Sequence, residues 1–253
     1  MTESSRTGGD YFSSQAAEYA RFRPRYPTEL FAYLAEVVPD HALAWDCATG
    51  SGQAAIPLTQ YFDRVIATDM SEAQIRHAEQ HPRVEYRVAP AEASGLATGS
   101  ANLITVAQAL HWLDLDGFYR EARRVLTPSG ALAVSSYGSA SLDDDKLSEA
   151  LAHLEWTTLG TYWPPRRQLV GEALLGLAFP FREVQPPQFH LEVRWTLAEL
   201  MGYVRSWSAT ARYVAAHGTD PLPELEAAMR PHWGSPDRKR VVRWPFVLRV
   251  GYA

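Results

Sequence analysis

The stretch Leu43-Ala-Trp-Asp-Cys-Ala-Thr-Gly-Ser-Gly-Gln53 carries the strongest structural signal in this chain of 253 residues. A short apolar run ends in an acid, Asp46, and small residues then occupy alternate positions: Ala48, Gly50 and Gly52. Small residues in a turn allow a ligand to lie directly against the backbone. A helix beginning near Gln53 would direct its free N–H groups at the same ligand. The pattern therefore predicts a strand, a ligand-binding turn and a helix.

A second acid, Asp69, follows another apolar run, Val65–Thr68, about 20 residues after the glycine turn. An acid at the end of the second strand is placed to accept hydrogen bonds from ribose hydroxyls. The glycine spacing argues against a dinucleotide motif, because Ala55 stands where the third glycine of G-x-G-x-x-G would be. The chain has no G-x-x-x-x-G-K-[ST] sequence either, which excludes a P-loop.

The segment Asp46-Cys-Ala-Thr-Gly-Ser-Gly52 resembles the first motif of the class I S-adenosylmethionine (SAM)-dependent methyltransferases, with Ala48 replacing the first glycine. The order of the following apolar runs agrees with that family, and they predict strands at 84–88, 101–108 and 131–135. Gln108-Ala-Leu-His-Trp-Leu-Asp114 is similar to the His-Trp segment of small-molecule methyltransferases related to trans-aconitate methyltransferase, often called type 11. The resemblance to the core covers about residues 40–137, and a weaker resemblance to this subgroup extends to the C-terminus.

The resemblance implies an α/β fold with a Rossmann-like, mostly parallel sheet, a reversed last strand and a helical cap. The alternation of strand and helix patterns up to about residue 137 independently predicts a parallel sheet with right-handed crossovers. We expect four segments: an N-terminal helical or cap segment (1–39), a SAM-binding core (40–137), a helical substrate cap with the sixth strand (138–240) and the last core strand (241–253).

The region after residue 137 predicts mainly helices, with two strands near its end. We expect helices over 147–159, 167–177, 197–213 and 222–233, in addition to 15–22 and 27–36 nearer the N-terminus. Phe189–Trp195 alternates with period two, and Val241–Val250 is a strand pattern whose pairing should be interrupted at Pro245. We assign these two segments to the terminal hairpin of the main sheet.

The resemblance implies SAM as the cofactor, released as S-adenosylhomocysteine. Asp69 should bind the ribose, Gly50 and Gly52 should face the methionine end, and the Met70 thioether should pack on adenine. The family also implies adenine contacts from the loop at Ala91 and Glu92, although Pro90 replaces an acid that is frequent there. The full set of expected cofactor contacts is Asp46, Ala48, Gly50, Gly52, Gln53, Asp69, Met70, Ala91, Glu92, Gln108 and Arg23.

His111 is the candidate general base, because an ordinary histidine pKa near 6.5 suits proton removal at neutral pH. A structural hydrogen bond or a cofactor contact are alternative roles, and a carboxylate acceptor would need no base. We expect residues 138–240, together with 23–26, to enclose a small organic acceptor. Carboxylates are among the candidate acceptors. The expected lining is Trp112, Tyr137, Trp207 and Tyr213, and Arg166 and Arg167 are candidates to bind an acidic group.

Composition limits the other function classes. A net charge of −5 and a pI near 5.9 argue against a nucleic-acid binder, and no apolar run is long enough to span a bilayer. The single cysteine, Cys47, suits a reducing cytoplasm, and no group of residues has metal-ligand spacing. We therefore expect a cytoplasmic monomer or homodimer with a small-molecule substrate and no metal. A non-catalytic SAM-fold binding protein and a nicotinamide-dependent dehydrogenase remain as alternatives.

Overall fold

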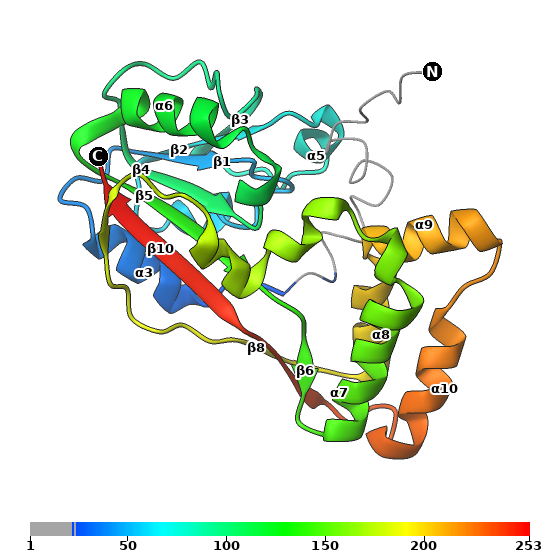
Figure 1. Cartoon of the computed structure of the whole chain (residues 1–253). Helices are drawn as coiled ribbons and strands as arrows, with labels where there is room; N and C mark the ends of the chain where they lie inside the picture. Colours follow the sequence, from blue (N-terminus) through cyan, green and yellow to red (C-terminus); the bar gives the residue numbers. More distant parts are fainter. Residues whose placement is uncertain (1–21, 23) are drawn as a thin grey trace, which may run out of the picture.

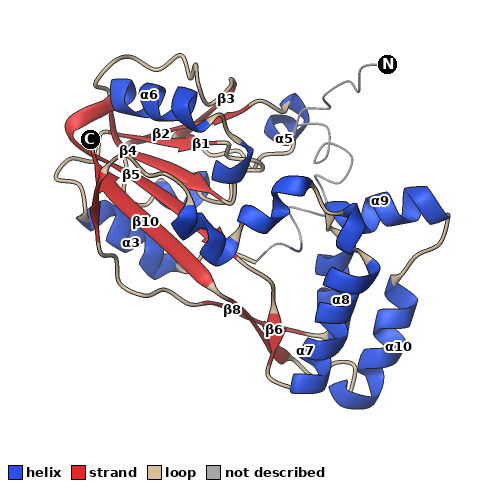
Figure 2. Ribbon diagram, in the orientation of Figure 1, coloured by secondary structure: helices blue, strands red, loops and turns tan. Residues whose placement is uncertain are grey.

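The computed structural model describes residues 22 and 24–253, and its main body is a seven-stranded sheet flanked by helices (Figures 1 and 2). The strand order is β3-β2-β1-β4-β5-β10-β7, in which β10 is antiparallel to both of its neighbours and β1 to β5 are parallel. The expected mostly parallel sheet with a reversed strand is confirmed. Its strands are β1 (Leu43–Cys47), β2 (Arg64–Asp69), β3 (Val84–Val88), β4 (Ala101–Ala107), β5 (Leu126–Tyr137), β7 (Arg182–Val184) and β10 (Phe246–Tyr252).

Helices cover the two faces of the sheet because its central strands are apolar on both sides. Helix α3 (Thr28–Glu36) packs on one face together with the short helix α4 (Ala55–Leu58), whereas α6 (Leu115–Val125) covers the other face (Figure 1). Trp45 of β1 packs on Phe118 of α6 with 6.2 Å between the ring centroids. Continuous burial along β1 and β4 is typical of parallel strands that have both faces covered. The remaining helix of the core, α5 (Glu72–Arg76), follows β2.

A second lobe, the cap, is formed by segments between β5 and β10, although β7 in this part of the chain pairs in the main sheet (Figure 1). It contains a small antiparallel sheet of order β6-β9-β8, with β6 (Ser141–Leu142), β8 (Leu191–Trp195) and β9 (Arg240–Trp244). Its helices are α7 (Asp145–Ala152), α8 (Leu197–Arg205), α9 (Ser208–His217) and α10 (Leu222–Trp233). Leu147, Leu200, Met229 and Trp233 are completely buried between these helices, so the cap has a hydrophobic core of its own.

Several shorter turns connect these elements. They are the 3₁₀ turns η2 (Leu110–Trp112), η4 (Gly160–Tyr162), η5 (Pro165–Leu169) and η6 (Gly171–Gly176), and the π-helical turn η3 (His153–Thr158). The helix expected over 167–177 is therefore wrong, because Gly171 has a φ of +64° and divides the segment into two turns. The helix expected over 197–213 is likewise two helices that are separated at residues 206–207. The helix expected over 15–22 falls almost entirely outside the described residues.

The expected terminal hairpin is wrong for residues 189–195. This segment forms β8 and pairs with β9 in the small sheet, whereas the neighbour of β10 in the main sheet is the three-residue strand β7. Pro245 interrupts the C-terminal strand pattern as expected, and it separates β9 in the cap from β10 in the main sheet. Alternation identified 189–195 as a strand, but it carries no information on which sheet completes the pairing.

Candidate functional site

The turn after β1 has an unusual backbone. Ala48, Gly50 and Gly52 have φ values of +54°, +58° and +89°, so the three small residues share the left-handed region. A Cβ on Gly50 would meet no atom within 4 Å, so a ligand can approach the backbone here. A Cβ on Gly52 would collide with the Tyr86 hydroxyl, and the φ of +89° also favours glycine at this position. The helix expected near Gln53 has only four residues, and Gln53 lies in the preceding turn.

Two carboxylates hold this turn. Asp46 is buried and accepts hydrogen bonds from the hydroxyls of Thr49 (2.5 Å) and Thr105 (2.7 Å). Burial raises the pKa of Asp46 to about 6. Asp69 accepts from the backbone N–H of Gly50 (2.9 Å) through Oδ2 and from that of Ser71 (2.8 Å) through Oδ1. An ionised carboxylate has about four acceptor positions, so Asp69 retains capacity for further donors.

An apolar surface lies beside Asp69. Met70 is 56% exposed and Val88 is 55% exposed, and Val88 is the β3 partner of Asp69 in the sheet register. Exposed large apolar side chains at the end of buried strands are suited to the face of a planar ring. Sequence analysis missed Val88, although the parallel pairing of β2 and β3 would have placed it beside the acid.

The loop after β3 is attached to helix α6. Ala91 is buried, and Glu92 accepts a hydrogen bond from the backbone N–H of Asp114 (3.2 Å), just before α6. The backbone N–H of Ala89 donates to the carbonyl of Asp69 (3.1 Å). The start of this loop is thereby fixed beside Asp69, while the Glu92 carboxylate is directed toward α6.

The end of β4 leads into the turn that carries His111 and Trp112, whose rings lie 4.9 Å apart. His111 is only 8% exposed, and its carbonyl accepts a hydrogen bond from Arg166 (3.1 Å). Burial, with the positive charges of Arg167 and Arg166, lowers the pKa of His111 to about 3. His111 is therefore neutral at physiological pH and a weak proton acceptor, which argues against a general-base role.

The two candidate arginines have different environments. Arg167 forms an ion pair with the buried Glu155 (2.7 Å), and its guanidinium lies 4.9 Å from the ring centroid of Trp163. Arg166 is exposed and donates through Nη1 to the carbonyls of His111 and Leu113. No carboxylate of the described residues pairs with Arg166. Arg167 is thus a structural residue of the cap, and Arg166 is the cation that an anionic ligand could reach.

The expected aromatic lining separates into two groups. Trp112 and Tyr213 are half-buried, whereas Tyr137 and Trp207 are only 4% and 3% exposed. Trp207 packs between Trp163 and Tyr203, with ring centroids 5.4 and 5.5 Å away, and so belongs to the cap core rather than to an open wall. Arg23 lies outside the described residues.

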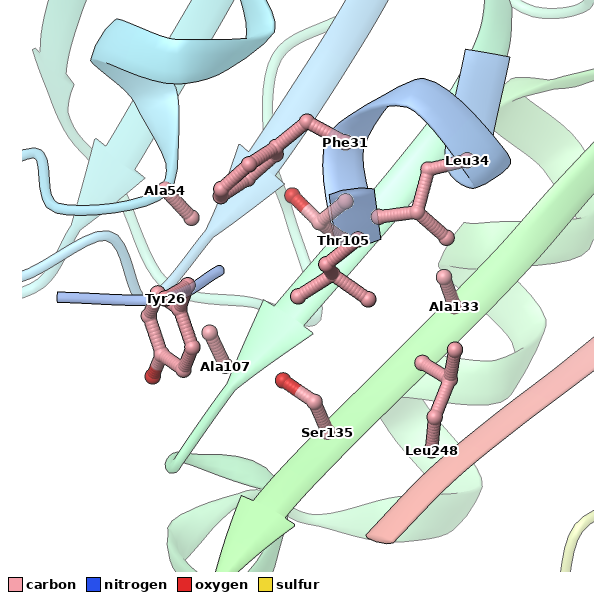
Figure 3. Close-up of a pocket in the computed structure, with 10 residues that line it drawn as sticks. Tyr26, Phe31, Leu34, Ala54, Thr105, Ala107, Ala133, Ser135 and Leu248 are labelled. Atoms are coloured by element: carbon pink, nitrogen blue, oxygen red, sulfur yellow. The ribbon is translucent and has the colours of Figure 1, made fainter. Parts of the chain in front are cut away.

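A small apolar pocket that is partly open to solvent lies between α3 and the main sheet. Figure 3 shows Phe31 and Leu34 of α3 on one side and Ala133 and Leu248 of the sheet on the other. Its lining residues are Tyr26, Leu30, Phe31, Leu34, Ala54, Thr105, Ala107, Ala133, Ser135 and Leu248. They come from distant parts of the chain, so no local sequence pattern indicated the pocket.

In the described part of the chain, no three His, Cys, Asp or Glu side chains are grouped to hold a metal ion. No helix among the described residues is long and apolar enough to cross a membrane.

The strand order, the left-handed turn after β1 and the acid at the end of β2 define a Rossmann-like methyltransferase fold. A family model described as a methyltransferase domain matches residues 45–134. A methyltransferase of Dictyostelium discoideum is 34% identical over 227 residues, which cover 87% of this chain and 85% of that protein. The chain belongs to the class I SAM-dependent methyltransferase family.

Two further similarities agree with this assignment. The solved structure of a type II methyltransferase from Anaeromyxobacter dehalogenans is 43% identical, with a TM-score of 0.84, and the match covers 91% of this chain and 98% of that one. A SAM-dependent methyltransferase of Saccharomyces cerevisiae is 27% identical over 135 residues, which are 49% of this chain and 45% of the yeast protein.

Proposed function

We propose that this methyltransferase transfers the methyl group of SAM to a small organic acceptor that carries a carboxylate. The observation that supports it most directly is the joint geometry of the turn after β1 and Asp69. The turn exposes backbone at Gly50, and Asp69 stands beside it with spare acceptor capacity.

The residues at the sheet edge fit a nucleoside cofactor. Asp69 would accept hydrogen bonds from the ribose hydroxyls, and the exposed side chains of Met70 and Val88 would contact the adenine ring. Ala48, Gly50 and Gly52 would face the methionine end, with Asp46 holding the turn through Thr49. Bound there, SAM supplies an activated methyl group for in-line displacement.

The acceptor is proposed to lie between the turn that carries His111 and the cap. Trp112 would contribute apolar surface, with Tyr213 of the cap and the largely buried Tyr137 of β5 as further contacts. Arg166 would pair with the acceptor carboxylate, because Nη1 alone is used by the described backbone carbonyls and the guanidinium fork suits a carboxylate. A carboxylate oxygen is already a nucleophile, which fits a neutral and weakly basic His111.

The decisive experiment is a methyl-acceptor screen with isotopically labelled SAM over small carboxylic acids, phenols and amines. We expect labelled methyl esters from acids, together with release of S-adenosylhomocysteine. Label transfer only to phenols or amines would refute the carboxylate assignment. Binding of SAM without transfer to any acceptor would instead favour a non-catalytic SAM-binding protein.

Variants test the assignment of Arg166. Arg166→Met should raise the KM for the acidic acceptor at least tenfold, because the neutral side chain cannot pair with a carboxylate. Arg83→Met removes another exposed arginine and is the matched control, so its KM should stay within twofold of wild type. Equal KM values for both variants would contradict a direct contact between Arg166 and the acceptor.

A further inference from the structure

Gln108, at the end of β4, has a strained backbone and a side chain that makes three hydrogen bonds to β5. Its φ of +56° is uncommon for a residue with a Cβ. Its amide oxygen accepts hydrogen bonds from the Ser136 hydroxyl (2.7 Å) and the Tyr137 N–H (3.1 Å), and its amide nitrogen donates to the Tyr137 carbonyl (3.0 Å). Such strain persists only where surrounding contacts fix the conformation, and here β5 provides them.

The same serine connects Gln108 to the cap. The Ser136 hydroxyl accepts a hydrogen bond from the backbone N–H of Gly171 (2.8 Å), at the start of η6. A Cβ on Gly171 would lie 2.8 Å from the Cα of Gly138, so this segment of the cap lies directly against the end of β5. A chain of hydrogen bonds therefore runs from Gly171 through Ser136 to Gln108.

A second contact from the same cap segment reaches the turn on its other side. Arg166 of η5 donates to the carbonyl of His111 (3.1 Å), three residues beyond Gln108. Arg166 and Gly171 are close in sequence, as are Gln108 and His111. The segment 165–171 thus contacts the turn 108–113 directly through the Arg166 side chain and indirectly from the Gly171 N–H through Ser136.

We propose that Gln108 is a positioning residue that couples the cap segment 165–171 to the turn carrying His111 and Trp112. The inference rests on the proposed function, because it assigns that turn to the space between cofactor and acceptor. A displacement of the cap segment would remove the Gly171 contact from the Ser136 hydroxyl and loosen its hydrogen bond to the Gln108 amide, so the turn would be held less firmly. Methyl transfer would then require the cap segment to stay in its observed position. A small displacement of a residue that contacts the substrate lowers the rate by a large factor.

The test uses hydrogen exchange of the full-length protein, read at residues 109–113. In the turn, the N–H groups of Trp112 and Leu113 donate to the carbonyls of Ala109 and Leu110. Ser136→Ala removes the hydrogen bonds that connect Gly171 to Gln108. Gln108→Asn tolerates a positive φ, but its shorter side chain cannot reach β5. Both variants should exchange these amides at least tenfold faster than wild type.

Ser100→Ala is the matched control, because it removes a serine hydroxyl that bonds to the carbonyl of Ala97 and not to Gln108. Its exchange at 109–113 should stay within twofold of wild type. Once a methyl acceptor is identified, Ser136→Ala should lower kcat at least tenfold and leave the KM for SAM within threefold of the wild-type value. Wild-type exchange at 109–113 in both variants, or an unchanged kcat, would overturn the coupling. Failure of wild type to bind S-adenosylhomocysteine in calorimetry would instead overturn the proposed function.

Discussion

Replacing Arg167 with methionine should destabilise the protein in a way that depends on pH. In the native structure, Arg167 neutralises Glu155, whose side chain is only 2% exposed and which also accepts a hydrogen bond from Ser139 (2.9 Å). Arg167→Met leaves this carboxylate buried without a countercharge. Removing one partner of a buried ion pair typically costs about 3–5 kcal/mol of stability.

The magnitude has a ceiling, because Glu155 can take up a proton instead of remaining charged. Each pKa unit corresponds to about 1.36 kcal/mol, so neutralising a carboxyl with the ordinary pKa of 4.5 costs about 3.4 kcal/mol at pH 7. The same step costs about 0.7 kcal/mol at pH 5. We therefore expect Arg167→Met to lower the free energy of unfolding by about 3 kcal/mol at pH 7 and by about 1 kcal/mol at pH 5.

Proton linkage determines the direction in which the stability of Arg167→Met changes with pH. Burial already raises the pKa of Glu155, and loss of Arg167 raises it further above the value in the unfolded chain. The folded state then binds the proton more tightly, so stability falls as the pH rises through this range. Below the unfolded-state pKa both states are protonated, and this destabilisation disappears.

Urea unfolding at pH 5 and pH 7 measures the effect, with the double variant Glu155→Gln/Arg167→Met as the control. The double variant has no charge at this buried site, so its loss of stability should be nearly equal at the two pH values. A similar loss for Arg167→Met at both pH values would refute the argument. The loss would then come from packing of Arg167 against Trp163, and not from an unpaired carboxylate.

Three further predictions concern the site. Asp69→Ala should weaken SAM binding by about 2–3 kcal/mol in calorimetry, whereas the exposed control Asp63→Ala should not; equal affinities would exclude the ribose contact. His111→Gln should leave the inflections of the pH–rate profile between pH 5 and 9 unchanged, because the pKa of His111 is about 3; a lost inflection near 6.5 would restore the base role. Gly52→Ala should lower the melting temperature, and Tyr86→Phe should recover part of the loss by removing the colliding hydroxyl; no recovery would assign the loss to backbone strain.

The sequence by itself determined the core of this protein. Short-range patterns carry that information: an apolar run ending in Asp46, small residues at alternate positions, and an acid closing the next strand. These features act within a few residues, so the strand and the turn followed from local chemistry. The resemblance of these motifs to a known family implied the reversed strand, which the structure confirms in β10.

Only the tertiary structure decided the cap and the properties of individual site residues. Strand alternation could not choose between two sheets for residues 189–195, because pairing depends on which edge is free in space. His111 appeared as a base from its ordinary pKa, but burial and two arginines more than 50 residues away lower that pKa. Arg166 and Arg167 are adjacent in sequence, yet only one has a buried acid beside it. Burial and charge at a site are sums over distant segments, and the fold alone brings those segments together.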